Sequence, residues 1–335
     1  MTVRTPREVD KVRWRQLAVR SRAPDPFASS PAWQLPFWWS QMSNGEIFIK
    51  QTDENLLLLK GYRAAPNTFA LDPPENMWFF GCNVLGRNGA EFLSNSLPDI
   101  ERQFASQSLA ITVSGLSPTG RLRRDLQRYF KADFEIVEMG GRARGVQCAA
   151  SLEGGWEGYL SRRSSNTRRN IRKQLRRADE AGVAYERHCP TALEADHLFD
   201  RMLAVELQSW KGIAGRGMEQ PGVTDFYRLM LRELSETADA RVIMARFEDR
   251  DIGFIFGGML GKIYRGQQFS FVDDWAAGSI GNTLQAEQIK WLCEEGSTRY
   301  GLGPLKRRRM EYKTHWTELE YDIRSIVMTR KSSAE

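Results

Sequence analysis

Three residues in the second half of the chain have side chains suited to moving a proton or stabilising a charge: Tyr312, Lys313 and Asp273. A tyrosine hydroxyl can donate a proton to a departing thiolate or alkoxide, and a lysine ammonium can stabilise a developing oxyanion. Asp273 ends a predicted strand, where a carboxylate could accept a proton from an attacking amine. These are the roles that acyl transfer to an amine requires. The alternatives are a packing tyrosine, a surface lysine and a turn-forming aspartate.

A glycine-containing loop, Gly278–Asn282, precedes a predicted helix from about Thr283 to Glu295. Glycines let a backbone approach an anion closely, and the first turn of a helix offers free N–H groups and the positive end of the helix dipole. The loop therefore predicts a phosphate-binding turn, with the candidate residues Ser279, Ile280, Gly281, Asn282 and Thr283. An ordinary strand-to-helix turn is the alternative.

The basic segment 162–177 lies mostly in a predicted helix that carries six cations before its first acid, Asp179. Like charges four residues apart each cost about 0.2–0.5 kcal/mol in an isolated helix. Arg168, Arg169 and Arg172 are therefore candidates for binding a polyanion such as tRNA, a nucleotide or a lipid phosphate, with Lys306–Arg309 as a second basic segment. A solvated helix face is an equally good interpretation.

Glu206 and Trp210 lie four residues apart near the end of another predicted helix. Residues at this spacing share a helix face, so together with Lys211 they could line a pocket for an acceptor substrate. The alternative is a helix end that packs its tryptophan.

Composition and motifs exclude several protein classes. Hydrophobic residues make up 41% of the 335 and charged residues 27%, which is ordinary globular usage for about two domains. The four cysteines form no C-x-x-C pair and the three histidines form no H-E-x-x-H, so we expect neither a disulfide scaffold nor a metal site. The common nucleotide-binding loops and the G-x-S-x-G elbow are also missing from the sequence.

Charge and hydropathy predict a cytoplasmic protein. The longest purely aliphatic run is Leu56–Leu59, far shorter than the roughly 20 residues that span a bilayer. No apolar segment of the kind found in secretory signals follows the N-terminal arginines. The net charge of +6 is weak evidence for an anionic partner.

The predicted elements divide the chain into a basic arm (1–30), a first domain (31–150) and a second domain (151–335). In the first domain we expect strands at 46–51, 56–62, 77–81, 109–113 and 134–138, and helices at 99–106 and 117–131. In the second we expect helices at 164–180, 191–210, 224–234 and 283–295, and strands at 183–188, 241–247, 252–260, 263–272, 298–301 and 319–329. Short connections between the three strands from 241 to 272 indicate an antiparallel meander.

This order of elements resembles the GNAT superfamily of N-acyltransferases, in which the loop after the fourth strand wraps the pyrophosphate of an acyl donor. More narrowly, the chain resembles the BioF2-like acetyltransferase group, relatives of the Fem peptidoglycan aminoacyltransferases. The resemblance covers roughly 150–330, and in the first half the most similar stretch is Phe80–Asn83. The segments that carry it are Arg168–Gly182, Ser209–Gly212, Ser279–Gly281 and Glu311–Trp316.

The resemblance implies an α/β (α+β) fold of tandem GNAT-like domains, with mixed, mostly antiparallel sheets flanked by helices. It implies an N-acyltransferase that moves an acyl group from acyl-coenzyme A to an amine, with no covalently bound cofactor. Transfer would be direct, because no cysteine or serine stands in a nucleophile motif. Two alternatives stay open: a Fem-like transferase with aminoacyl-tRNA as donor, and a non-catalytic protein that binds nucleic acid or anionic lipid on the same scaffold.

Overall fold

The computed structural model describes residues 2–3, 6–41, 46–66, 68–75, 78–104, 108–305 and 311–331. The chain forms two compact units, one of residues 1–147 with 321–335 and the other of residues 148–320. The change of unit near 148 lies close to the expected boundary at 150. The last strand, β14 (Leu319–Arg330), differs from the expectation, because it pairs with β6 (Ser108–Leu116) and β7 (Phe134–Glu138) of the first unit.

The first unit contains a mixed, mostly antiparallel sheet. Its strand order is β1-β2-β3-β4-β6-β14, in which only β4 and β6 are parallel, while β5 pairs with β3 and β7 with β14. The remaining strands and the helices are β1 (Thr2–Val3), β2 (Glu46–Gln51), β3 (Asn55–Ala65), β4 (Thr68–Asp72), β5 (Val84–Gly86), α1 (Lys11–Arg20), α2 (Pro31–Gln41), α3 (Gly89–Ser94), α4 (Leu97–Phe104) and α5 (Arg121–Phe130).

The N-terminal segment differs from the irregular arm that the sequence predicts, because it contains α1. Asp10 caps this helix by accepting a hydrogen bond from the Arg13 N–H group at 2.9 Å. Trp14 is buried and donates to the carbonyl oxygen of Ser29 at 2.8 Å. The strand predicted at 77–81 does not form over residues 78–81, and residue 77 lies outside the described part of the chain.

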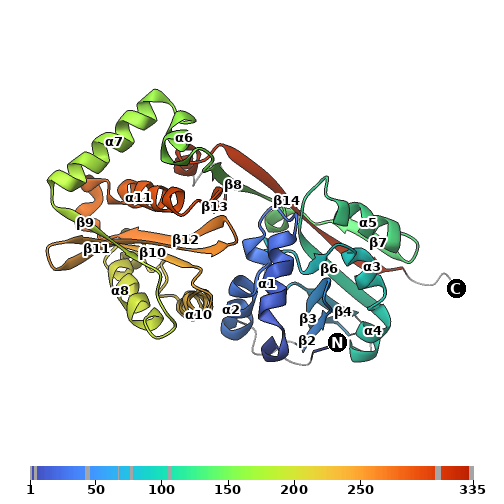
Figure 1. The fold of residues 1–335 in the computed structure, drawn as a ribbon. Helices are drawn as coiled ribbons and strands as arrows, with labels where there is room; N and C mark the ends of the chain where they lie inside the picture. Colours follow the sequence, from blue (N-terminus) through green and yellow to red (C-terminus); the bar gives the residue numbers. More distant parts are fainter. Residues whose placement is uncertain are drawn as a thin grey trace. The chain divides into compact units, whose positions relative to one another are not determined.

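The second unit has a sheet whose faces are both covered by helices (Figure 1). Its strand order is β8-β13-β12-β11-β10-β9, and the predicted antiparallel meander is confirmed for β10, β11 and β12. Helices α11 and α8 pack on opposite faces, α11 together with α6 and α7, and α8 together with α10. The strands and helices are β8 (Gly145–Ser151), β9 (Val183–His188), β10 (Ala240–Phe247), β11 (Arg250–Leu260), β12 (Ile263–Phe271), β13 (Arg299–Pro304), α6 (Gly155–Ser161), α7 (Ser165–Glu180), α8 (Ala195–Leu207), α9 (Trp210–Ile213), α10 (Val223–Ser235) and α11 (Ile280–Glu294).

Local sequence signals explain the ends of α7. The Ser164 hydroxyl accepts a hydrogen bond from the Thr167 N–H group at 3.1 Å, which confirms the predicted N-cap. Gly182 follows the helix with a φ of +79°, a backbone conformation that glycine adopts at little cost. Ile171 is buried in the core cluster that also contains residues of α11. This apolar contact packs α7 against α11 and leaves the basic side of α7 facing outward.

Strands β12 and β13 run parallel but pair over only three residues, and the last pair is Arg265–Gly301. Next to this point β12 contains a bulge opposite Phe256 and Gly257 of β11. Beyond it, β12 continues along β11 to Phe271 without β13 beside it in the ladder. We call the region past the last pair the β12–β13 split.

Candidate functional site

Tyr312 lies in the short 3₁₀ helix η5 (Glu311–His315), which follows β13. Its ring packs edge-on against Phe269 of β12, with 6.1 Å between the ring centroids, and the residue is 40% exposed. Tyr312 therefore lies next to β12 in the split, and part of its side chain is accessible to solvent. Partial burial raises the pKa of its hydroxyl to about 12, so that the group is protonated at neutral pH, as a proton donor must be.

Lys313 is buried, although it follows an accessible tyrosine. Its Nζ donates hydrogen bonds to the carbonyl oxygens of Leu302 and Pro304 at 2.7 and 2.8 Å. Both carbonyls belong to β13 past its last pair with β12. Lys313 thus attaches η5 to β13, and its role in stabilising an oxyanion stays a prediction.

Asp273 is exposed at the start of the 3₁₀ helix η4 (Asp273–Gly278), which follows β12. Its backbone N–H group donates to the carbonyl oxygen of Gln208 at 3.0 Å, so the turn is attached to the segment after α8. The carboxylate is accessible to a second substrate, and its role as proton acceptor stays a prediction.

Ser279 forms the turn that starts α11. It has a φ of +59°, unusual for a residue other than glycine, and its carbonyl oxygen accepts hydrogen bonds from the N–H groups of Asn282 and Thr283 at 2.9 and 3.2 Å. Asn282 is exposed and Ser279 is half-buried. These two residues are the accessible members of the predicted phosphate-binding turn.

The other three predicted residues of this turn, Ile280, Gly281 and Thr283, are buried. A Cβ atom at Gly281 would lie 2.9 Å from the ring of Phe271, so only glycine allows α11 to begin this close to β12. The Thr283 hydroxyl donates to the carbonyl oxygen of Ile280 at 3.0 Å and accepts from the Tyr185 hydroxyl at 2.6 Å. At these three positions, only backbone groups could contact a phosphate.

Glu206 and Lys211 form a buried ion pair on the α8 side of the sheet. Glu206 is fully buried, and its Oε2 lies 3.2 Å from the Lys211 ammonium. Lys211 also donates to the carbonyl oxygen of Phe269 at 3.0 Å and lies 3.3 Å from the Gln268 side-chain oxygen. Lys211 therefore contacts β12 in the split at Phe269, the residue on whose ring Tyr312 packs.

Trp210 does not share a face with Glu206, contrary to the expectation. Helix α8 ends at Leu207, and Ser209 caps the separate short helix α9 by accepting from the Lys211 N–H group at 3.2 Å. The break turns Trp210 outward, and it is 57% exposed. An acceptor could contact this indole, while Glu206 is out of reach of solvent.

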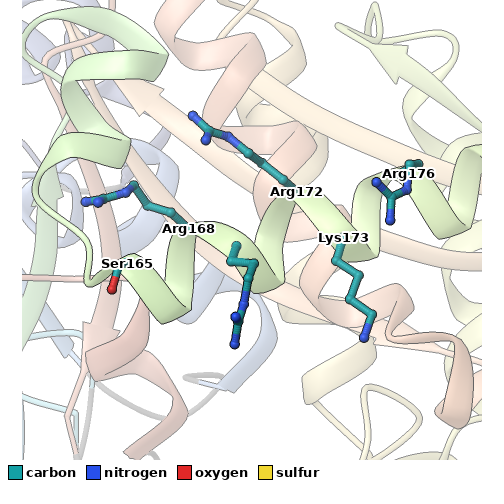
Figure 2. A pocket seen from close by; sticks show the side chains of 6 residues that line it. Ser165, Arg168, Arg172, Lys173 and Arg176 are labelled. Carbon is teal, nitrogen blue, oxygen red and sulfur yellow. The ribbon is translucent and has the colours of Figure 1, made fainter.

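The cations of α7 line a concave surface patch, and Arg172 and Lys173 extend to opposite sides of the helix (Figure 2). Their contacts are made at the margins: Arg168 donates to the carbonyl oxygen of Arg163 at 2.7 Å, and Arg172 lies 3.5 Å from an exposed Glu157. The second basic segment, Lys306–Arg309, lies outside the described residues. The patch is lined by Ser165, Arg168, Arg169, Arg172, Lys173 and Arg176.

Gln268 and Tyr227 belong to the site but were missed by the sequence analysis. The Gln268 side-chain amide donates to the Tyr227 hydroxyl of α10 at 2.7 Å. One sequence signal did exist, because Gly257 stands in the middle of an apolar strand, where glycine often marks a close approach. A Cβ atom there would lie 2.3 Å from the Tyr264 ring, next to the bulge that precedes Gln268.

Metal and membrane features are not found in the described ranges. No group of three or more metal-ligating side chains was found in them, and none of their helices is long and apolar enough to cross a bilayer.

A comparison with protein families identifies the second unit. Residues 165–314 match the family model described as an acetyltransferase (GNAT) domain. These residues form a GNAT domain. The β12–β13 split, the turn before α11 and Tyr312 all lie within it. The GNAT resemblance stated from the sequence is therefore confirmed.

Solved structures share the fold across both units. FemX is 9% identical, with 96% of each chain covered and a TM-score of 0.64. A conserved protein of unknown function from Bacteroides thetaiotaomicron VPI-5482 is 11% identical over 96% of this chain and 97% of its own, with a TM-score of 0.62. The C-terminal domain of a putative lysylphosphatidylglycerol synthetase from Agrobacterium fabrum is 13% identical over 95% and 91%, with a TM-score of 0.54. A search of curated protein sequences gave no match.

Proposed function

We propose that the GNAT domain transfers an acyl group directly from a coenzyme A thioester to an amine. The observation that carries this proposal is the β12–β13 split, because two parallel strands that separate leave backbone groups open to a bound donor. The accessible turn at Ser279 and Asn282 begins α11, whose first N–H groups suit the donor's phosphates.

Two side chains supply the proton transfers: Tyr312, which packs on Phe269 of β12, and Asp273, which follows the end of β12. The amine attacks the thioester carbonyl, so that a C–N bond forms and the C–S bond breaks. Asp273 takes the proton that the amine loses, and the Tyr312 hydroxyl gives a proton to the departing thiolate.

A second candidate donor, aminoacyl-tRNA, is favoured by the α7 patch. At 3.6 residues per turn, the side chains from Arg168 to Lys173 and Arg176 fan over an arc of about 140°, opposite the buried Ile171. Cations spread over one side of a helix in this way can neutralise several phosphates of a nucleic acid. The first turn of α7 also lacks an acid, so its arginines oppose the helix dipole instead of balancing it.

Titration against both donors tests these proposals. A coenzyme A enzyme is stabilised thermally by acetyl-coenzyme A or a longer acyl-coenzyme A, by mass action on the folded state. Stabilisation by charged tRNA, without any by acyl-coenzyme A, would favour aminoacyl-tRNA as the donor. Binding of RNA or of anionic vesicles without turnover of either donor would instead support a non-catalytic protein.

The α7 patch has a matched control in α5, which also carries four arginines. Changing Arg168, Arg169, Arg172 and Lys173 to glutamine is expected to weaken tRNA binding and to lower the slope of log K against log salt by about 0.9 for each phosphate that is no longer neutralised. Equal removal of charge from α5 should leave that slope unchanged. Identical slopes in both variants would show that the α7 cations are a solvated face. The α5 control changes Arg121, Arg123, Arg124 and Arg128.

A further inference from the structure

At the β12–β13 split, two neighbouring strands inside the sheet stop pairing with one another. Backbone carbonyl groups of a buried strand need hydrogen-bond donors, and a parallel neighbour normally supplies them. Past the pair Arg265–Gly301, β12 and β13 no longer donate backbone hydrogen bonds to one another. Other donors are therefore required if the strands are to stay apart.

A lysine meets this need on β13. The buried Lys313 ammonium donates to the carbonyl oxygens of Leu302 and Pro304, the second of which is the last residue of β13. A lysine rarely loses its water shell in this way, and hydrogen bonds to a charged donor are stronger than neutral ones. The contact also fixes the start of η5, and with it the neighbouring Tyr312.

A second lysine plays the same part on β12. The Lys211 ammonium donates hydrogen bonds to the carbonyl oxygen of Phe269 and the side-chain oxygen of Gln268, and it forms an ion pair with the Glu206 carboxylate. Gln268 is held from its other end by the Tyr227 hydroxyl. The backbone just after the bulge is thus attached to α9 and α10.

We propose that Lys211 and Lys313 are a pair of positioning residues, each of which holds one strand of the β12–β13 split through hydrogen bonds to backbone or side-chain oxygens. The inference rests on the proposed function, because the split matters only if a donor enters it. Neither ammonium then touches the reacting carbonyl. Lys211 places Phe269, Lys313 places Tyr312, and the reaction depends on the two lysines through those aromatic residues.

The test compares Lys211→Met and Lys313→Met with a control, Lys290→Met. Lys290 of α11 forms an ion pair with Glu287 at 2.8 Å and lies over the Trp156 ring, and neither of these partners belongs to β12 or β13. Amide hydrogen exchange measures the opening of each strand without any substrate. We expect Lys313→Met to speed exchange about tenfold or more at residues 302, 303 and 305, and Lys211→Met to do so over 267–270. The control should alter neither segment.

Steady-state kinetics add a readout that separates positioning from chemistry. Both variants should raise KM for the donor and lower kcat, while the pH profile of kcat keeps its shape, and Lys313→Arg should recover part of the loss because it can still donate to the two carbonyls. Unchanged exchange in both strands, with one limb of the pH profile abolished, would overturn the proposal and make Lys313 a catalytic residue. If Lys313→Met does not fold, Lys313→Gln gives the same exchange comparison. If no donor is turned over, the proposed function fails, and hydrogen exchange still decides whether the lysines hold the strands.

Discussion

Removing either member of the Glu206–Lys211 pair should destabilise the second unit, and by unequal amounts. At 3.2 Å, two unit charges attract by about 5 kcal/mol if the effective dielectric constant is about 20. Most of this is offset by the loss of hydration when both charges are buried. The carboxylate is fully buried, whereas 19% of the Lys211 side chain is exposed. An unpaired Glu206 is therefore the more costly of the two.

We expect Lys211→Met to lower the free energy of unfolding by about 3–5 kcal/mol, since it leaves a buried carboxylate without its counter-charge. Glu206→Gln should cost about 1–3 kcal/mol, because glutamine can still accept from the Met218 N–H group, which lies 3.2 Å from Glu206 Oε1. The double variant should be more stable than the sum of the two losses predicts, by at least about 1 kcal/mol.

Urea unfolding at pH 7, followed by circular dichroism, measures all four proteins, and an unchanged m-value shows that the same surface is exposed in each. Additive losses would refute the reasoning, because they would mean that the two charges do not interact. Equal costs for the two single variants would refute the burial argument while leaving the pair itself intact.

Three other outcomes are expected. Tyr312→Phe should lower turnover about 10²–10⁴-fold without changing donor affinity, and a rate equal to that of the unchanged protein would remove the proton-donor assignment. Partial burial raises the pKa of Glu186, but hydrogen bonds from Arg201 and Arg246 have the larger, opposite effect and bring this pKa down to about 2. The contribution of Glu186 to stability is therefore present above pH 4.5 and should be lost as the pH falls towards 2. Acid unfolding curves of Glu186→Gln should not show this loss. Burial raises the pKa of Glu75 to about 8, so the stability of the first unit should fall by about 3 kcal/mol between pH 4.5 and pH 7, a slope that Glu75→Gln should remove from the urea midpoints.

Elements defined by local signals were predictable from the sequence. Ser164 and Gly182 bound α7 as expected, because capping and a left-handed glycine depend on neighbours within a few residues. The meander of β10, β11 and β12 followed from its short connections. The GNAT domain could be recognised because these elements come in a fixed order, which the sequence displays directly.

Pairing over long sequence distances was not predictable in the same way. β14 reads as an alternating strand, but alternation says which residues are buried and not which strand lies beside it. Its pairing with β6 and β7 joins residues about two hundred positions apart in the sequence. The N-terminal helix α1 was missed because only three of its ten residues are buried and half of them are polar or charged.

The candidate site shows why residue type is a poor guide to a residue's role here. The sequence marked Lys313 because lysine can stabilise an oxyanion, and Lys211 as part of an acceptor pocket. It marked Ile280 and Thr283 as part of a predicted phosphate-binding turn. All four are buried or largely buried, and each has contacts within the protein that account for its position.

The parting of β12 and β13 explains these placements together. A strand that leaves its neighbour exposes carbonyl groups, so charged donors become necessary inside the protein, and lysine is long enough to bring one from an adjacent element. The same separation makes room for Tyr312 beside Phe269, where no ladder partner of β12 stands. Buried lysines and an accessible tyrosine next to each other are thus two consequences of one break in the sheet, and a break of this kind is set by tertiary packing that no local pattern in the sequence records.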